Sequence, residues 1–249
     1  MARILAFIGA KGGTLKTASV AAVAHVIAKA GVRVVMVDGD PQADLTSRSG
    51  FARVADPLAA EPVRVRYDGE PEMDLQLLRG GRSLEAVDVE TARRHLARAA
   101  ALDADLVVVD TPPALGPITT AALREAALVI IPAMPGKESL ERAHDVLTLA
   151  RLQPEPPAVR ILLTLAHLQS NLFRWMREQV DEHYPQARME PVVPYEMPAG
   201  EAALFEVPVT VSAPRSRSAY AYCEVAAEVL GRLRLERQTA APGAARGVA

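Results

Sequence analysis

At 249 residues the chain is long enough to bury a large core as one α/β domain. Its net charge of −2 provides no overall attraction to nucleic acid or anionic lipid, so any such binding must come from a local patch. Cys223 is the only cysteine, which excludes an internal disulfide and any cysteine-built metal site within one chain, and we expect this thiol to pack in the core.

Short apolar runs alternate with longer amphipathic segments along the chain. The apolar runs are nearly continuous Val, Ile and Leu, which is typical of strands covered on both faces. The predicted strands are residues 4–8, 32–37, 106–109, 128–131, 159–165 and 189–193. The predicted helices are residues 17–30, 83–102, 118–126, 138–152, 172–184 and 219–237. This alternation predicts an α/β fold: a doubly wound, mostly parallel sheet with helices on both faces.

Two regions depart from this alternation. Residues 50–80 contain three prolines and scattered charges, and we expect a short β-hairpin formed by residues 63–67 and 75–78. Residues 238–249 are rich in Ala and Gly, and we expect a disordered tail after one domain spanning residues 1–237. No stretch approaches the roughly 20 apolar residues of a membrane-spanning helix, so we expect a cytoplasmic protein.

The segment from Gly9 to Thr17 follows the first predicted strand and opens a helix. Glycines allow successive backbone N–H groups to surround a phosphate, and the helix N-terminus adds its positive dipole end. Lys16 can reach the β- and γ-phosphates, and the Thr17 hydroxyl can bind Mg²⁺. The residues expected to bind the nucleotide here are Gly12, Gly13, Thr14, Leu15, Lys16 and Thr17.

The usual pattern G-x-x-x-x-G-K-[ST] does not fit this loop, because Ala10 and Leu15 stand where glycines belong. The pattern K-G-G-x-x-K-[ST] does fit, with Lys11 five residues before Lys16. A glycine-rich turn with incidental lysines is the simpler alternative, but two of only four lysines fall in this loop. We therefore interpret the segment as the phosphate loop of a P-loop NTPase that binds ATP and Mg²⁺ and hydrolyses ATP.

Carboxylates follow two further predicted strands. Asp38 and Asp40 end the run beginning at Val34, and Asp110 ends the run beginning at Leu106. Open α/β sheets bind ligands at the carboxyl ends of their strands, where one carboxylate can hold a Mg²⁺-bound water and another can position the attacking water. A strand-end aspartate can also simply begin a turn, but its combination with the loop favours a functional set.

On these segments the chain resembles the ParA/MinD family of deviant Walker-A ATPases, and most closely the short Soj-type ParA proteins. The resemblance spans about residues 3–235 and includes K-G-G-T-L-K-T, D-G-D-P-Q and D-T-P-P. It implies an ATP-dependent homodimer that binds non-specific double-stranded DNA, with a ParB-like partner that stimulates hydrolysis. The implied role is chromosome or plasmid partitioning in the nucleoid-associated cytoplasm.

The resemblance also implies residue roles. Lys11 would reach the partner subunit's phosphates, with binding in its own loop as the alternative, and Gly12 would lie where two loops meet. Asp40 would assist hydrolysis, and Asp110 would organise Mg²⁺ through water. Thr111 and Pro194 would be further nucleotide contacts.

The chain departs from the family pattern at two places. Leu15 replaces the usual glycine, and if this position requires positive φ, strain of roughly 1–2 kcal/mol is expected. Tyr195 and Glu196 stand where Soj-like proteins usually carry arginines.

The remaining basic element lies after Ala213, where six arginines against three glutamates give a local net charge of +3. We expect Arg217 and then Arg215 to contact DNA, while a solvated helix face is the alternative. Tyr220 and Tyr222 are expected mainly to pack.

Three other functions fit parts of the sequence. A MinD-like ATPase that cycles on a membrane needs a C-terminal amphipathic helix, but residues 231–237 alternate charged and apolar positions with period two. An orphan ParA-like ATPase could position a protein cargo. An amide-forming synthetase could share the fold, although no substrate pocket is recognisable in the sequence.

Overall fold

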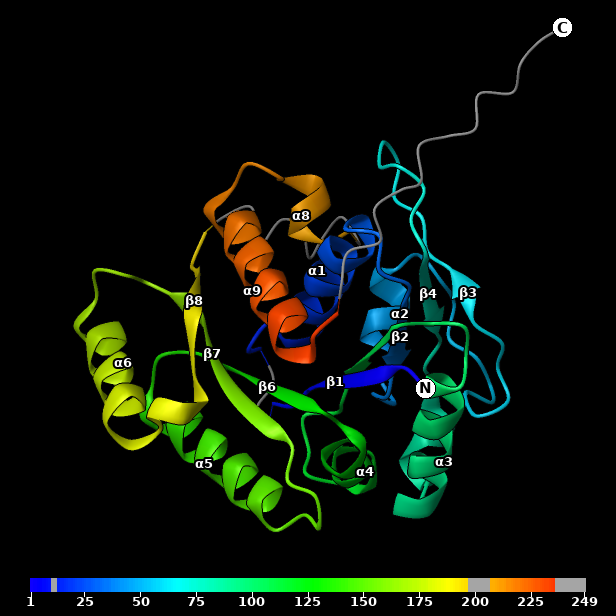
Figure 1. The fold of residues 1–249 in the computed structure, drawn as a ribbon, viewed down its shortest axis with the longest axis horizontal. Helices are drawn as coiled ribbons and strands as arrows, with labels where there is room; N and C mark the ends of the chain where they lie inside the picture. The colour runs from blue at the N-terminus through cyan, green and yellow to red at the C-terminus, as the bar shows by residue number, and fades with distance from the viewer. Residues whose placement is uncertain (10–12, 197–206, 236–249) are drawn as a thin grey trace, which may run out of the picture.

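The computed structural model describes residues 1–9, 13–196 and 207–235. Figure 1 shows a single sheet with helices on both sides. The strands are β1 Arg3–Phe7, β2 Val34–Asp38, β3 Val63–Arg64, β4 Leu75–Leu78, β5 Leu106–Asp110, β6 Leu128–Ala133, β7 Ala158–Ala166 and β8 Arg188–Pro194. The α-helices are α1 Lys16–Lys29, α2 Asp44–Arg48, α3 Val89–Ala100, α4 Pro117–Glu125, α5 Lys137–Arg151, α6 Asn171–His183, α8 Val209–Ser212 and α9 Arg217–Leu233. Short 3₁₀ turns span Arg82–Ala86 and Pro185–Ala187.

The eight strands form one sheet in the order β3-β4-β2-β5-β1-β6-β7-β8. Every neighbouring pair is parallel except β3 and β4, which form the expected antiparallel hairpin. β1 lies between β5 and β6, so the loop after it opens at the middle of the sheet. The predicted doubly wound α/β fold is confirmed.

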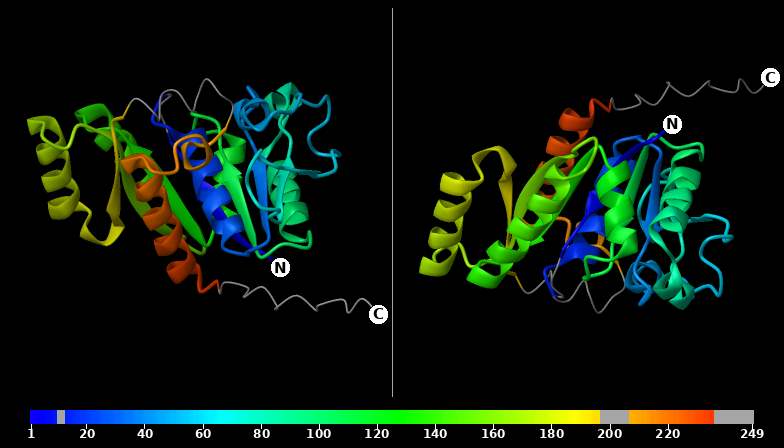
Figure 2. Two further views of the ribbon diagram at one scale, coloured as in Figure 1. Left: turned by 90° about the horizontal axis from the view of Figure 1, so that it is seen from above. Right: turned by 90° about the horizontal axis from the view of Figure 1, so that it is seen from below.

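Two apolar layers cover the sheet, and the two views of Figure 2 show the helices that lie over each of its faces. Alternate side chains of each central strand point to opposite layers, so the layers share strands but contain different residues. α1, α8 and α9 pack on one face, while α3, α4, α5 and α6 pack on the other. Because both faces are covered, the strands are apolar at nearly every position, as the sequence indicated.

The predicted helix at residues 83–102 is wrong at its start. A 3₁₀ turn at Arg82–Ala86 comes first, Val87 is extended, and α3 begins only at Val89. The side chain of Asp88 caps α3 by accepting a hydrogen bond from the Thr91 N–H at 2.7 Å. The Asp88 side chain can cap the Thr91 N–H only if α3 begins directly after residue 88. The cap therefore separates α3 from the preceding 3₁₀ turn.

Two other sequence expectations need correction. Cys223 is exposed rather than in the core, because its neighbour Tyr222 takes the inward position on α9. Tyr220 is 58% exposed, whereas Tyr222 is buried and packs as expected. The sequence also did not predict the short helices α2 and α8. The expected tail at 238–249 lies outside the described residues.

A buried hydrogen bond joins the two helices that cover the central strands. The hydroxyl oxygens of Ser19 on α1 and Tyr222 on α9 lie 3.0 Å apart, and both residues are almost fully buried. Burial also raises the pKa of Tyr222 to about 12, so its hydroxyl remains protonated and can donate. The pair fixes the helix that follows the phosphate loop against the last helix of the chain.

We expect Tyr222→Phe to lower the free energy of unfolding by about 1 kcal/mol, because it leaves the buried Ser19 hydroxyl without its partner. Chemical denaturation followed by circular dichroism measures this change. Tyr220→Phe is the matched control, since the Tyr220 side chain is exposed, and it should change stability by less than about 0.5 kcal/mol. Equal losses in the two variants would contradict the assigned role of the pair.

Candidate functional site

The loop between β1 and α1 has the backbone conformation expected of a phosphate-binding loop. Gly13 has a φ of 80°, and Leu15 lies in the left-handed region with φ 61° and ψ 22° immediately before α1. Alternating left-handed residues turn consecutive N–H groups toward one side of a loop, which creates a site for an anion. Lys11 and Gly12 lie outside the described residues. The positive φ suspected at Leu15 is confirmed.

A hydrogen bond from strand β7 supports the phosphate loop. The Thr164 hydroxyl on β7 donates to the Thr14 carbonyl oxygen at 3.0 Å, and both residues are buried. The next residue, Leu165, has a φ of 50°, and the pairing of β7 with β8 shifts register there. The irregularity in β7 therefore occurs beside the hydrogen bond that positions the loop.

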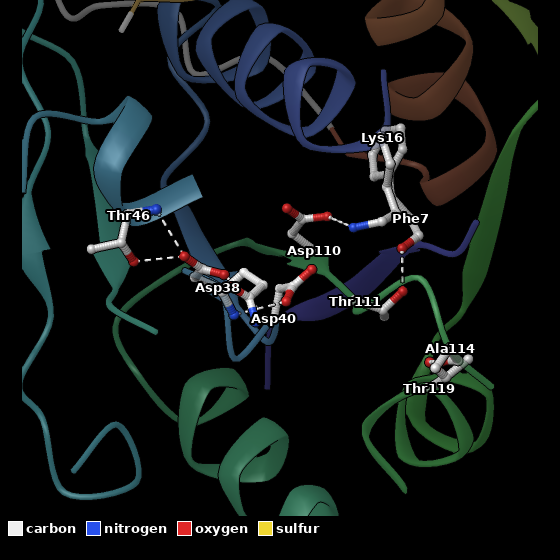
Figure 3. Close-up of polar contacts among 10 residues, drawn as sticks. Phe7, Lys16, Asp38, Asp40, Thr46, Asp110, Thr111, Ala114 and Thr119 are labelled. Atoms are coloured by element: carbon white, nitrogen blue, oxygen red, sulfur yellow. Dashed lines mark hydrogen bonds and ion pairs between the residues drawn. The ribbon is translucent and has the colours of Figure 1, made fainter. Parts of the chain in front are cut away.

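Lys16, the first residue of α1, contacts the carboxylate of Asp110 at the end of β5 (Figure 3). Asp110 has no exposed surface and Lys16 is 8% exposed, so the two charges neutralise each other in a desolvated setting. The second oxygen of Asp110, Oδ2, is buried and has no hydrogen-bond partner among the described residues. A buried carboxylate oxygen with unused capacity suits a metal-bound water, so Asp110 and Thr17 fit a Mg²⁺ ion.

Asp38 lies directly beside Asp110, because β2 and β5 pair in register at these two residues. One Asp38 oxygen accepts from the Thr46 N–H at 2.7 Å and from the Thr46 hydroxyl at 2.6 Å, as Figure 3 shows. The other accepts from the Asp40 N–H at 3.2 Å. Burial and the nearby Asp110 charge raise the pKa of Asp38 to about 7, although these hydrogen bonds oppose the rise.

Thr46 connects this carboxylate to the outer part of the sheet. Its hydroxyl oxygen also accepts from the Gly80 N–H at 2.8 Å, just after β4. A Cβ atom at Gly80 would lie 2.8 Å from the Asp38 carboxyl carbon, so only glycine allows this approach. Asp38, Thr46 and Gly80 therefore hold together the ends of β2 and β4 and the start of α2.

Asp40 is held in the turn between β2 and α2. It is 8% exposed, and its carboxylate accepts from the Gln42 N–H at 2.9 Å. Ala43, which closes this turn, has a positive φ of 54°. Burial raises the pKa of Asp40, while the Gln42 hydrogen bond and the Lys16 charge oppose the rise. Hydrogen bonds to Asp38 and from the Gln42 N–H fix this turn, and Ala43 gives it a strained backbone. Such a turn can hold the Asp40 side chain in one position.

The phosphate loop and the Asp40 turn face each other across a cavity of about 270 Å³. The predicted residues Gly13, Thr14, Leu15, Lys16, Thr17 and Asp40 all line it. Gln42, Asp44 and Arg48 also line it and were not predicted, although the D-P-Q motif was a signal for Gln42. A larger cavity of about 340 Å³ lies between α5, β7 and the 3₁₀ turn after α6, away from these carboxylates.

Two predicted nucleotide contacts, Thr111 and Pro194, form hydrogen bonds within the protein, and their predicted contact with nucleotide stays a prediction. The Thr111 hydroxyl donates to the Phe7 carbonyl oxygen at 2.9 Å and ties the ends of β5 and β1 together (Figure 3). Pro194 ends β8, and its carbonyl oxygen accepts from the Ser218 hydroxyl at 3.3 Å. Neither residue lines the cavity between the described parts of the phosphate loop and the Asp40 turn.

The described arginines after Ala213, which exclude Arg237 and Arg246, do not form one patch. Arg215 and Arg217 are exposed where α9 begins, near the end of β8. Arg232 lies 15 residues further along α9, which is about 22 Å in an α-helix, and it pairs with Glu228 at 2.7 Å. Arg217 itself contacts Glu196 at 2.7 Å, a partner that sequence analysis did not identify.

Comparison with known proteins gives consistent results. The sequence model of the CobQ/CobB/MinD/ParA nucleotide binding domain matches residues 5–236. The chromosome-partitioning ATPase Soj of Thermus thermophilus is 31% identical over 242 residues, covering 93% of this chain and 96% of that protein. The sporulation initiation inhibitor protein Soj of Bacillus subtilis is 28% identical over 250 residues, covering 92% and 98%.

A solved structure gives the same fold with ligands. Cobyrinic acid a,c-diamide synthase from Mycobacterium smegmatis, with a bound ATP analog and magnesium, superposes with a TM-score of 0.76. It is 25% identical and covers 94% of this chain and 96% of its own.

The left-handed conformation of Leu15 gives a test of strain in the loop. Leu15→Ala and Leu15→Gly both remove the leucine side chain beyond Cβ. Only glycine also removes the Cβ atom, which causes the cost of positive φ. We expect Leu15→Gly to be more stable than Leu15→Ala by about 1 kcal/mol in denaturant unfolding. In the regular helix α1 the order reverses, so Ala22→Gly should destabilise by about 1 kcal/mol. A lower stability for Leu15→Gly than for Leu15→Ala would contradict the strained conformation.

The Asp38–Thr46 contact gives a test of how the Asp40 turn is positioned. Thr46→Val removes the hydroxyl between the Asp38 carboxylate and the Gly80 N–H, and we expect kcat for ATP hydrolysis to fall at least about ten-fold. Thr46→Ser keeps the hydroxyl and should restore most of kcat. Thr210→Val removes another buried, hydrogen-bonded hydroxyl, the partner of His25 away from the cavity, and should leave kcat unchanged. Equal effects of the two valine variants would exclude a specific role for Thr46.

Proposed function

The chain belongs to the CobQ/CobB/MinD/ParA nucleotide-binding family, and from this we propose that it partitions DNA as an ATP-dependent homodimer. It is a P-loop ATPase of the ParA/Soj-like group, with ATP and Mg²⁺ as its cofactors. In the proposal, the ATP-bound dimer binds non-specific double-stranded DNA of a chromosome or plasmid. A ParB-like partner then stimulates hydrolysis and releases it.

The observation that carries the ATPase function is the convergence of Lys16, Asp110 and Asp40 around the described phosphate loop. Lys16 begins α1 with its ammonium group against Asp110, so it can exchange this contact for phosphate oxygens of similar charge. Asp110 keeps one buried oxygen available, and Thr17 lines the same cavity. Mg²⁺, when bound, neutralises charge on the β- and γ-phosphate oxygens.

Asp40 is the residue we assign to positioning the attacking water. It lines the cavity opposite the phosphate loop, and its turn is fixed by Asp38 and by the Gln42 N–H. An ionised carboxylate at this place can accept a hydrogen bond from water and orient it toward the γ-phosphate. The chemistry needs little from the protein beyond this placement and the positive charge of Lys16.

Dimerisation is proposed from the loop sequence. Lys11 adds little beside Lys16 within its own loop, whereas across an interface it can neutralise charge on the other subunit's nucleotide. Gly12 leaves room for two loops to meet. Both residues lie outside the described part of the chain, so these roles rest on sequence and family, with binding of Lys11 in its own loop as the alternative.

DNA binding is proposed for the surface where α9 begins. Arg215 and Arg217 are exposed there, and phosphate contacts need only a local basic patch, which a dimer doubles. Arg232 is a poor candidate, because it pairs with Glu228 in the same helix and lies toward its other end. For Arg232, the alternative that it belongs to a solvated helix face fits better.

A membrane-cycling ATPase is a further alternative, and it would bind the membrane through a C-terminal amphipathic helix. Among the described residues, no helix combines the length and apolarity needed to cross a membrane. The diamide synthase shares the fold and binds an ATP analog, which relates to the alternative of an amide-forming synthetase. The chromosome-partitioning relative Soj covers a similar share of this chain. Positioning of a protein cargo remains the alternative, favoured by the acidic Glu196 beside Arg217.

We expect Asp40→Ala to retain duplex DNA in the presence of ATP, and not with ADP or without nucleotide. The variant should bind ATP without hydrolysing it, so the DNA-binding dimer should accumulate. Electrophoretic mobility shift with duplexes of unrelated sequence, repeated across a salt series, measures this binding.

Arg217→Ala in the same background should weaken DNA binding about ten-fold and reduce the salt dependence, because it removes a phosphate contact from each subunit. Arg232→Ala is the matched control and should change binding by less than about two-fold. An ATP-bound dimer that fails to bind DNA would support a protein cargo instead, and would overturn the proposed role in DNA partitioning.

A further inference from the structure

Glu196 occupies an unusual place beside the proposed DNA-binding surface. It follows β8 by two residues, and its carboxylate is 15% exposed. One oxygen accepts from the Arg217 Nε at 2.7 Å. The other accepts from the Ser218 N–H at 2.8 Å and from the Ser218 hydroxyl at 3.0 Å. Both carboxylate oxygens are therefore held by groups at the start of α9.

The contact joins the carboxylate to the arginine that we assign to DNA. The Arg217 side chain is 67% exposed, so it remains accessible at the surface. Burial alone would raise the pKa of Glu196, but the hydrogen bonds from Arg217 and Ser218 outweigh it and hold the pKa below its usual value. Glu196 is therefore charged at neutral pH, and it neutralises Arg217 where a DNA phosphate must approach.

Capping of α9 accounts for only part of this arrangement. Ser216 caps the Ala219 N–H at 3.1 Å and Glu196 caps the Ser218 N–H, but neither cap requires the contact with the Arg217 side chain. The Arg232–Glu228 pair joins neighbouring turns of one helix, whereas Glu196 reaches Arg217 from the end of another element, 21 residues earlier in the chain. Its oxygens accept from an arginine, a backbone N–H and a hydroxyl, which are the groups that bind phosphate oxygens in protein–DNA contacts.

We propose that Glu196 is an internal competitor of the DNA phosphate for Arg217, and that it keeps a single subunit from binding DNA. The inference rests on the proposed DNA-binding function. A phosphate that contacts Arg217 must displace the carboxylate or lie next to it. Repulsion between two unit charges about 4 Å apart in water lowers affinity about five-fold for each subunit, and about 25-fold for two.

This competition would increase the dependence of DNA binding on the dimer. One subunit presents Arg217 already neutralised, so its gain from a phosphate contact is small. Two subunits held together by ATP present two such surfaces, and the second contact becomes intramolecular, which raises the apparent affinity without any new contact. Glu196 therefore weakens DNA binding by a single subunit, and the avidity of the dimer offsets this loss.

The test compares Glu196→Gln with wild type for binding to a fluorescent duplex, with ATP and with ADP. Glutamine keeps an acceptor oxygen for Ser218 but removes the charge. We expect binding about five-fold tighter for each subunit, a steeper salt dependence and detectable binding with ADP. Glu190→Gln is the control, because it removes the same charge from an exposed glutamate that also pairs with an arginine, Arg188. Thermal melting and ATP turnover show that each variant is folded.

The variants also separate failure of this inference from failure of the proposed function. The gain in DNA affinity from Glu196→Gln should disappear in an Arg217→Ala background. Its loss would show that Glu196 acts through Arg217. If wild type binds DNA with ATP but Glu196→Gln binds no better than Glu190→Gln, the competition is overturned and the DNA-binding function stands. If neither wild type nor Glu196→Gln binds DNA with any nucleotide, both proposals are overturned.

Discussion

The site depends on two buried carboxylates placed side by side. Asp38 and Asp110 end neighbouring parallel strands in register, and neither has any exposed surface. Two adjacent negative charges without water are unfavourable unless each finds compensation. Lys16 supplies a positive charge to Asp110, and Thr46 supplies two hydrogen bonds to Asp38. The phosphate loop and the Asp40 turn are thus anchored by the groups that make burial of these carboxylates tolerable.

This constraint divides the acidic residues by role. Asp38 accepts hydrogen bonds from Thr46 and from the Asp40 N–H, so it acts as a structural anchor. Asp110 has a buried oxygen with no partner in the described part of the chain and contacts Lys16 of the phosphate loop, so it is suited to binding the metal. Asp40 lies in a strained turn that lines the cavity, so it is suited to positioning a water molecule. Three aspartates in similar sequence contexts therefore differ because their surroundings differ.

Partners also distinguish the charged residues at the surface. Arg217 and Arg232 are both arginines on α9, and both pair with a glutamate. The partner of Arg232 lies one turn away in the same helix, whereas the partner of Arg217 comes from the end of β8. A charge count along the chain treats these arginines alike. Only their partners distinguish a helix-surface pair from a contact that can control binding, which is why the Glu196 contact carries the inference about regulation.

The sequence by itself determined the fold class and predicted the phosphate loop and the candidate residues Lys16, Asp40 and Asp110. These are local signals, because buried strands, glycine-rich turns and strand-end carboxylates occupy short stretches of chain. Positive φ at Leu15 was also suspected from one missing glycine. The start of α3 was missed, although the Asp88 cap was a readable local signal.

The tertiary structure decided which distant groups meet. Thr46 reaches Gly80 across 34 residues and Thr164 reaches Thr14 across 150, and no local pattern encodes such pairs. Likewise, the partner of Arg217 depends on where β8 ends relative to α9. Strand order and helix packing fix these distances, so they can be obtained only once the chain is folded.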